Sequence, residues 1–135
     1  METTFGHLQI NVRAENLEFY RDLMGFLGWA TLAEGEGYLG YGERNGASLW
    51  FIGGANDAEN DYDGRGMNHI GIGAASQADV DATVAYLQQN GVACLFETPR
   101  HRPDFSASEE QTYYQVMFES PDRVLFEVVY TGPKS

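Results

Sequence analysis

The sequence predicts an α+β fold made of two tandem modules, each a strand, a helix and three further strands. The first observation behind this prediction is an internal repeat at about half the length of the chain. His7-Leu8-Gln9-Ile10 matches His69-Ile70-Gly71-Ile72, and Gly28-Trp29-Ala30-Thr31-Leu32 matches Gly91-Val92-Ala93-Cys94-Leu95. The second observation is that apolar residues alternate around each histidine, then take helical spacing, and then alternate again. Each repeat therefore contains both a helix and several strands.

The 135 residues suit one domain that contains two half-size modules. We expect the modules at about residues 5–53 and 67–131, within a single domain that spans residues 1–135. Between them, Gly53 to Gly66 (GGANDAENDYDGRG) is rich in Gly, Asn and Asp, a composition typical of a solvated linker. We place this linker at residues 54–66.

In the first module, a strand begins near His7, in the run FGHLQINV, which alternates apolar and polar side chains. A helix follows over about residues 16–26, and four apolar side chains share one of its faces. These are Leu17, Tyr20, Leu23 and Met24. Three strands are expected after the helix, at roughly residues 29–33, 36–42 and 47–52. The last two strands are joined by a turn with Asn45-Gly46, a pair that favours a β-hairpin.

The second module repeats this order from His69, in the run MNHIGIGA. Its helix opens at Ser76 or Gln77 and ends at Asn90-Gly91. The apolar face of this helix carries Val80, Val84 and Leu87. Three strands are expected at residues 92–96, 112–119 and 124–130. The stretch Glu97 to Gln111 (ETPRHRPDFSASEEQ) shows no apolar period, so we predict a long loop there.

Composition excludes several classes of function. The formal charge is −12, from 8 Lys+Arg against 20 Asp+Glu, and such a chain repels both nucleic acid and anionic lipid. No stretch approaches the roughly 20 apolar residues of a membrane-spanning helix, and the N-terminus lacks the basic and apolar regions of a signal peptide. The only cysteine, Cys94, is expected in the core and cannot form an internal disulfide. These features predict a cytoplasmic protein whose partner is a small-molecule substrate.

Three residues at matching places in the repeat can bind a metal ion. His7 and His69 each lie in the first strand of a module, and Glu127 lies in the last strand of the second module, in the run RVLFEVVY. Two imidazoles and one carboxylate are the ligands of a facial metal site. This set accepts a divalent ion of Fe, Mn, Zn, Ni or Co without choosing among them. The alternative is that the histidines are ordinary strand residues, but two of only three histidines fall at equivalent positions.

This pattern resembles the vicinal oxygen chelate superfamily, which includes glyoxalase I, bleomycin-resistance proteins and extradiol dioxygenases. In the first module, the signature is LEFYRDL followed by Gly25-Phe26-Leu27-Gly28. In the second, YYQVMF leads to Ser120-Pro121-Asp122 and Phe126-Glu127-Val128. The resemblance covers about residues 5–130 and implies a cupped mixed sheet with the metal ligands on its concave floor. It also implies a homodimer, with a cup formed either within one chain or across two.

One position departs from the resemblance. Glyoxalase I and the related epimerase carry a second glutamate on the last strand of the first module. In this chain ASLWFI aligns with VLFEVV there, which places Trp50, or a neighbour within one residue, opposite Glu127. A tryptophan neither ligates a metal ion strongly nor abstracts a proton. We therefore do not expect the mechanism of a typical glyoxalase I.

Four residues are candidates for the substrate pocket. On an alternating strand, Gln9 shares the face of His7, and Trp50 would provide an apolar wall for a ring. Tyr114 and Arg100 are the other two candidates. Arg100 belongs to the basic cluster Arg100-His101-Arg102 of the predicted loop, which could close over an anionic substrate or remain a solvated loop.

The pattern leaves the catalytic group unknown, with three candidates. Tyr113 and Tyr114 follow each other on one strand, so one faces the cup and the other the opposite side. The inward tyrosine could donate a hydrogen bond to the substrate or simply pack in the core. His101, in the basic cluster, is the third candidate. Asn68 precedes His69 and is a candidate to orient that imidazole.

The leading hypothesis is a metal-dependent enzyme, of the lyase, isomerase or dioxygenase type, acting on a small oxygen-rich molecule. In this hypothesis the substrate chelates a metal ion held by His7, His69 and Glu127. The alternative comes from another class. It is a metal-free protein that binds and sequesters a drug, as bleomycin-resistance proteins do, which would suit an acidic chain with aromatic residues in the cup.

Overall fold

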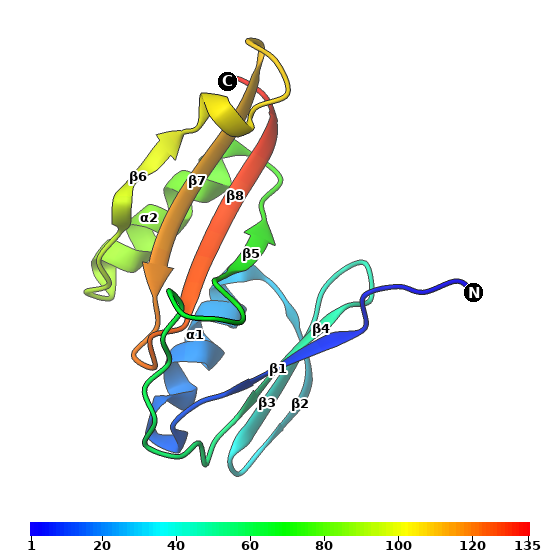
Figure 1. Ribbon diagram of the computed structural model, residues 1–135, viewed down its shortest axis with the longest axis vertical. Helices are drawn as coiled ribbons and strands as arrows, with labels where there is room; N and C mark the ends of the chain where they lie inside the picture. The colour runs from blue at the N-terminus through cyan, green and yellow to red at the C-terminus, as the bar shows by residue number, and fades with distance from the viewer. The chain divides into compact units, whose positions relative to one another are not determined.

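The computed structural model describes residues 1–135 and divides them into two compact units, Met1–Glu59 and Asn60–Ser135. Each unit contains one four-stranded mixed sheet and a helix, in the predicted order of strand, helix and three strands (Figure 1). The predicted α+β class with duplicated β-α-β-β-β modules is confirmed. The boundary between the units falls inside the predicted linker. The assembly of both units into one cupped domain stays a prediction.

The first unit contains β1 (His7–Asn11), a 3-10 turn (Ala14–Asn16), α1 (Leu17–Leu27), β2 (Ala30–Gly35), β3 (Tyr38–Gly42) and β4 (Ser48–Ile52). Its strand order is β1-β4-β3-β2, with β1 parallel to β4 and the other neighbours antiparallel. The strand β1 is therefore an edge of the sheet. The hairpin between β3 and β4 turns at the predicted place, where Gly46 N donates to Glu43 O over 3.2 Å.

One face of the first sheet packs on α1. The four side chains predicted for the helix face, Leu17, Tyr20, Leu23 and Met24, are all buried. Tyr20 stacks on Phe51 of β4 with ring centroids 4.5 Å apart. The helix ends at Gly28, whose φ of 81° is the left-handed conformation that glycine adopts without strain. Because β1 alternates, Ile10 is buried in this core while His7 and Gln9 are exposed.

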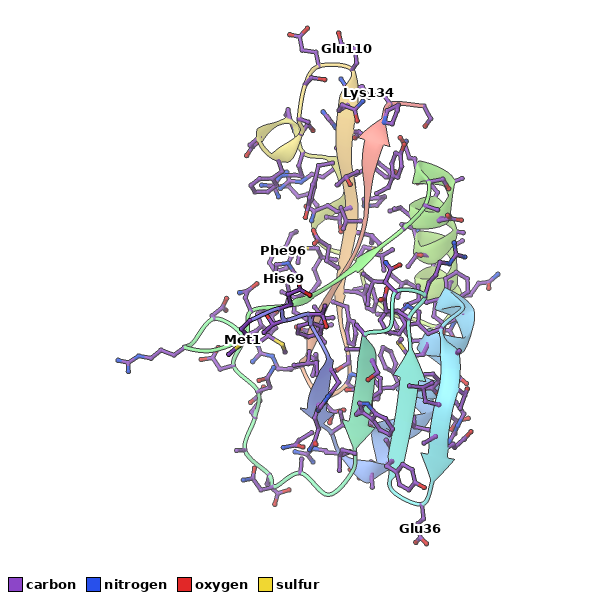
Figure 2. The ribbon with its side chains drawn as sticks, turned by 90° about the vertical axis from the view of Figure 1, so that its right-hand side faces the viewer. Met1, Glu36, His69, Phe96, Glu110 and Lys134 are labelled. Carbon is purple, nitrogen blue, oxygen red and sulfur yellow. The ribbon has the colours of Figure 1, made fainter.

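The second unit contains β5 (Ile70–Gly73), α2 (Gln77–Gln89), β6 (Leu95–His101), a 3-10 turn (Pro103–Phe105), β7 (Gln111–Glu119) and β8 (Leu125–Pro133). Its strand order is β5-β8-β7-β6, and β5 is parallel to β8. Figure 1 shows β7 and β8 as a long antiparallel pair. Glu110 and Lys134 lie together at one end of this pair, where Lys134 N donates to Glu110 O over 2.9 Å (Figure 2).

The helix α2 covers one face of the second sheet. Ser76 caps its start, because Ser76 Oγ accepts a hydrogen bond of 3.1 Å from Asp79 N. Val80 and Leu87 of this helix are fully buried, as predicted, whereas Val84 is only partly buried. Phe118 and Phe126 stack in this core with centroids 5.5 Å apart. The longer helix, α2, has 13 residues, too few to span a bilayer.

The predicted loop after the second helix is partly wrong. Residues 97–101 belong to β6, which begins at Leu95 and runs to His101, whereas the strand was expected at residues 92–96. The pairing with β7 is irregular between Leu95 and Arg100, and Phe96 and Glu97 have φ angles of 56° and 60°. Such a bulge breaks the alternation of side chains on which strand prediction depends.

The linker is more ordered than its composition predicts. Tyr62 is buried, and it packs with Met117 and Leu125 of the second unit. Its hydroxyl donates a hydrogen bond of 2.8 Å to Glu119 Oε2. A single aromatic residue thus anchors the end of a segment that is otherwise rich in Gly, Asn and Asp. The backbone of Tyr62 also contacts Asn68, the residue before His69.

Candidate metal centre

The register of β7 and β8 decides which side chains share a face with Glu127. Met117 pairs with Glu127 and Gln115 with Val129, and directly paired residues point to the same side of a sheet. The opposite side is covered by α2, because the hydroxyl of Tyr114 donates to Asp81 of that helix over 2.7 Å. Glu127 therefore lies on the face of the second sheet that carries no helix. We call this the Glu127 face.

Glu127 is a buried carboxylate whose oxygens are held by two neighbours on β7. It is 4% exposed, and the Tyr113 hydroxyl lies 3.0 Å from Oε1 and 2.9 Å from Oε2. The Gln115 side-chain amide donates to Glu127 Oε2. Burial of a carboxylate is tolerated only when hydrogen bonds or a cation compensate for lost water. These contacts fix the direction of the carboxylate.

His69 turns one ring nitrogen toward this carboxylate. It directly precedes β5 (Figure 2), and its Nε2 lies 3.5 Å from Glu127 Oε1. Its Nδ1 lies 2.8 Å from Asn68 Oδ1, as predicted for an orienting residue. Asn68 Nδ2 donates to the carbonyl of Tyr62 over 2.9 Å, so the amide oxygen of Asn68 faces the imidazole. An oxygen only accepts, and Nδ1 of His69 therefore carries the proton.

In a neutral imidazole with this tautomer, His69 Nε2 has a lone pair that faces a carboxylate oxygen. Two acceptors at this distance repel each other unless a proton or a metal ion lies between them. Two ligands about 2.1 Å from one ion, at a tetrahedral angle, are about 3.4 Å apart. The observed 3.5 Å between Nε2 and Oε1 fits this separation. The donor pair of His69 and Glu127 therefore fits a divalent metal ion.

Gly71 leaves the space that this pair needs. It pairs with Glu127 in the register of β5 and β8, and a Cβ added there would lie 3.3 Å from Glu127 Oε1. Gly71→Val is expected to displace the carboxylate and to weaken metal binding by about tenfold or more. Isothermal titration with Zn or Mn measures the change. Gly73→Val is the matched control on the same strand and face, because its Cβ meets nothing within 4 Å. Equal affinities of the two variants would contradict the role of Gly71.

His7, the third predicted ligand, lies in the first unit. It begins β1, as His69 precedes β5, and it is exposed. In neither unit do three or more His, Cys, Asp or Glu side chains gather closely enough to hold a metal ion. The role of His7 thus stays a prediction that rests on the equivalence of its position to that of His69.

The register confirms that Trp50 occupies the place of the missing carboxylate. Gln9 pairs with Trp50 in the first unit as Gly71 pairs with Glu127 in the second. The Trp50 ring covers Gly40, which has no side chain to obstruct it, and its Nε1 donates to Ser48 Oγ over 3.0 Å. Gln9 and Trp50, both predicted for the pocket, thus share one face of the first sheet.

The two tyrosines lie on opposite faces of β7, as alternation predicts. Tyr113 takes the Glu127 face, and loss of water together with its hydrogen bond to Glu127 raises the pKa of Tyr113 to about 12. Tyr114 takes the face toward α2, and loss of water together with its hydrogen bond to Asp81 raises the pKa of Tyr114 to about 12. Tyr113 is thus the tyrosine that the structure brings to the candidate metal centre.

The residues of the basic cluster Arg100-His101-Arg102 also lie on different faces of the second sheet. His101 pairs with Tyr114 across β6 and β7, and its Nδ1 lies 2.6 Å from the hydroxyl of Thr112. Arg100 pairs with Gln115, which places it on the Glu127 face. Arg102 also reaches that face, because its Nη1 donates to Gln115 Oε1 over 3.2 Å. The arginines, and not the histidine, lie on the side of the candidate metal centre.

Two functional candidates were missed by the sequence reasoning. Gln115 follows Tyr113 by two residues on the same strand, so alternation already places both on one face. Phe105 has no such signal, because it lies in an irregular segment; its ring meets Tyr113 edge-on at 5.4 Å. Cys94, expected in the core, is only partly buried, and desolvation raises the pKa of its thiol, which disfavours the thiolate.

Comparison with known proteins agrees with this architecture. A sequence model of the Glyoxalase/Bleomycin resistance protein/Dioxygenase superfamily matches residues 4–128. None of the curated proteins matches the chain. A solved structure described as a candidate glyoxalase, from Bacillus halodurans, is 25% identical with a TM-score of 0.75, over 93% of this chain and 94% of that one.

Two further structures share the fold at lower identity. A glyoxalase/bleomycin resistance protein from Albidiferax ferrireducens is 22% identical, with a TM-score of 0.71 over 93% of this chain and 98% of that one. A glyoxalase/dioxygenase from Nostoc punctiforme is 15% identical, with a TM-score of 0.68 over 96% of this chain and 91% of that one. The family match covers most of the chain and both duplicated modules. The chain belongs to the Glyoxalase/Bleomycin resistance protein/Dioxygenase superfamily.

Proposed function

We propose that the protein is a metal-dependent enzyme that acts on a small oxygen-rich substrate chelated by the metal ion. The observation that carries this proposal is the Nε2 of His69, which faces the buried carboxylate of Glu127 at 3.5 Å while Nδ1 contacts the side-chain oxygen of Asn68. His69 and Glu127 would hold the ion, with His7 as the third ligand. Three protein ligands leave positions open for two substrate oxygens.

The metal ion, when bound, would act as a Lewis acid on the substrate oxygens. The ligand set suits Fe, Mn, Zn, Ni or Co. Tyr113 is the residue that would position the carboxylate, because its hydroxyl contacts both oxygens of Glu127. With its pKa raised to about 12, Tyr113 stays protonated near neutral pH and keeps its donor. Asn68 would hold the His69 ring in the tautomer that binds metal.

The reaction of a typical glyoxalase I is not the one we propose. That reaction needs a second carboxylate, and Trp50 occupies the equivalent position in the first unit. A lyase, another isomerase or a dioxygenase reaction remains compatible with a three-ligand site. Oxygen dependence in a substrate screen, run with and without air, separates the dioxygenase from the other two classes.

We also propose that the protein works as a homodimer in the cytoplasm. The strands near the two histidines, β1 and β5, are each an edge of their four-stranded sheet. An edge strand has unpaired backbone groups that can pair with a further strand. Sedimentation equilibrium measures the mass, and a mass near that of one chain would contradict the dimer.

Elemental analysis of His69→Ala tests the metal proposal. The wild-type protein, purified without chelator, is expected to contain close to one divalent ion per chain, and the variant less than about 0.1. His101→Ala is the matched control, because it removes a histidine that pairs with Tyr114 on the other face. Wild-type protein with less than about 0.1 ion, and no thermal stabilisation by Mn, Fe, Zn or Ni, would contradict the proposal.

A second candidate function is metal-free binding of an aromatic or cationic drug. The observation that favours it is the Trp50 ring, which lies over Gly40 beside Gln9 and offers an aromatic surface on a helix-free face. Quenching of Trp50 fluorescence by a drug, in protein that takes up no metal, would support this function over the enzyme. Gly40→Val is expected to displace the ring and weaken such binding.

A further inference from the structure

We infer that the Glu127 face contains a subsite for a substrate carboxylate, with Arg102 as its anchor and Phe105 beside it. This inference deepens the proposed function, because it names the substrate class of the same site, a small planar molecule that carries a carboxylate. It concerns only residues of the second unit, and its test does not require a bound metal ion.

Arg102 presents a guanidinium that is fixed before any ligand arrives. Its carbon Cζ lies 4.6 Å from the centroid of the Phe105 ring, and its Nη1 donates to Gln115 Oε1 over 3.2 Å. Its backbone N donates to Tyr113 O over 2.7 Å, and its carbonyl accepts from Ser106 Oγ over 2.8 Å. A side chain held on both sides loses little conformational entropy when it binds a ligand.

The guanidinium keeps donors for a ligand. It carries five N–H groups in a planar fork that matches a carboxylate. One of them is used by Gln115, and the carboxylate of Asp104 lies 3.7 Å from Nη2, beyond hydrogen-bond length. About a quarter of the side chain, 24%, is exposed. The fixed fork is therefore still open to an anion.

Arg100 adds a second positive charge to this face. It pairs with Gln115 across the strands, on the side to which Arg102 also reaches. Its Nε is buried and has no hydrogen-bond partner, and its Nη1 lies 3.5 Å from the exposed carboxylate of Glu97. A carboxylate bound nearby would gain a Coulombic attraction to this guanidinium.

The arginines are not needed to neutralise Glu127. That carboxylate already accepts hydrogen bonds from Tyr113 and Gln115, and Arg102 reaches it only through the Gln115 amide. The chain as a whole has a charge of −12, yet charges farther than about 10 Å are screened at moderate salt. Two of the eight Lys and Arg residues thus lie together on this face, where a ligand carboxylate would compete with the exposed carboxylates of Glu97 and Asp104 for their guanidinium groups.

The position of Arg102 relative to Glu127 indicates which kind of substrate could reach both residues. A single glutamine amide separates the guanidinium from the proposed metal ligand. A substrate could therefore place its carboxylate on Arg102 and its chelating oxygens near Glu127. Phe105 is 57% exposed and meets Tyr113 edge-on, so an apolar planar body could pack against its open face.

Titration of the metal-free protein with benzoate, followed by ¹⁵N NMR, tests the subsite. Benzamide, which has the same shape without the charge, is the control ligand. We expect benzoate to shift the signals of Arg102 and Phe105 and to bind at least about tenfold more tightly than benzamide. In Arg102→Gln we expect benzoate to bind about 10- to 100-fold more weakly, and in Arg102→Lys to an intermediate degree.

Arg65→Gln is the matched control variant, because it removes an exposed arginine of the same unit and should leave benzoate binding unchanged. Equal binding of benzoate and benzamide, unchanged binding in folded Arg102→Gln, or no benzoate binding by the wild type would each overturn the inference. Tighter binding of phenyl phosphate than of benzoate would overturn the choice of carboxylate. Metal uptake is measured separately on the same variants, so a failed metal proposal is distinguished from a failed subsite.

Discussion

Glu127→Gln is expected to bind a divalent metal ion at least about 100-fold more weakly than the wild-type protein. The substitution preserves the size of a buried side chain that is held by Tyr113 and Gln115, but it removes the negative charge of the ligand. A neutral amide is a far poorer ligand for Fe, Mn or Zn than a carboxylate. Isothermal titration with Zn or Mn gives the two dissociation constants.

The matched control is Glu110→Gln, which makes the same chemical change at an exposed glutamate at the far end of the β7–β8 pair (Figure 2). Its metal affinity should equal that of the wild type. Circular dichroism of Glu127→Gln should show an intact fold, because the isosteric amide leaves the core of Phe118 and Phe126 untouched. If the folded Glu127→Gln protein binds the metal ion with wild-type affinity, Glu127 is not a metal ligand, and the 3.5 Å contact with His69 has another role.

The sequence predicted most of the architecture because the two modules repeat each other. Each repeat supplied an independent reading of the same order of elements, and periodicity placed the helix faces at Tyr20 and Val80 correctly. Errors occurred where the backbone departs from regular geometry. The bulge at Phe96 and Glu97 explains why β6 was expected at residues 92–96 and not at Leu95–His101, because side chains do not alternate through a bulge.

The candidate site was predictable to the extent that it follows strand alternation. Alternation separated Tyr113 from Tyr114, but it could not choose which tyrosine shares the face of Glu127. That choice depends on the pairing of β7 with β8, a contact between distant parts of the chain. Alternation also says nothing of Phe105, since its position depends on an irregular segment held by backbone hydrogen bonds.

The alignment of Trp50 with Glu127 shows how a repeat can carry functional information. The two modules have the same register, so corresponding positions of β4 and β8 can be compared directly. One position carries a buried carboxylate and the other an aromatic ring over Gly40. The second sheet thus presents a face with a buried carboxylate, and the first sheet a face with an aromatic ring at the corresponding position. Fold alone does not choose a reaction, whereas this asymmetry would restrict the proposed metal-dependent chemistry to mechanisms with a single glutamate ligand.

The free energy of unfolding is expected to fall steeply between about pH 10 and about pH 12, and Tyr113 and Tyr114 should cause much of this fall. Both side chains have pKa values raised to about 12 in the folded protein, against about 10 when unfolded. The unfolded state therefore loses its phenol protons first as pH rises. The stabilisation is fully present below about pH 10 and is lost as pH rises through about 12.

The double variant Tyr113→Phe/Tyr114→Phe isolates this contribution. Each tyrosine is expected to contribute on the order of 1–2 kcal/mol to the fall, because partial exposure screens part of the effect of a two-unit shift. Urea unfolding at about pH 8 and about pH 11.5 gives the fall for each protein. The variant should lose less free energy of unfolding than the wild type over this interval, whatever its stability at about pH 8.

Glu127→Gln tests the contact between Tyr113 and the candidate metal ligand. Removing the charge of Glu127 lowers the pKa of Tyr113 and should therefore reduce the contribution of Tyr113 to the fall in the free energy of unfolding. Identical falls in all three proteins would show that the Tyr113 hydroxyl does not hold the Glu127 carboxylate in solution.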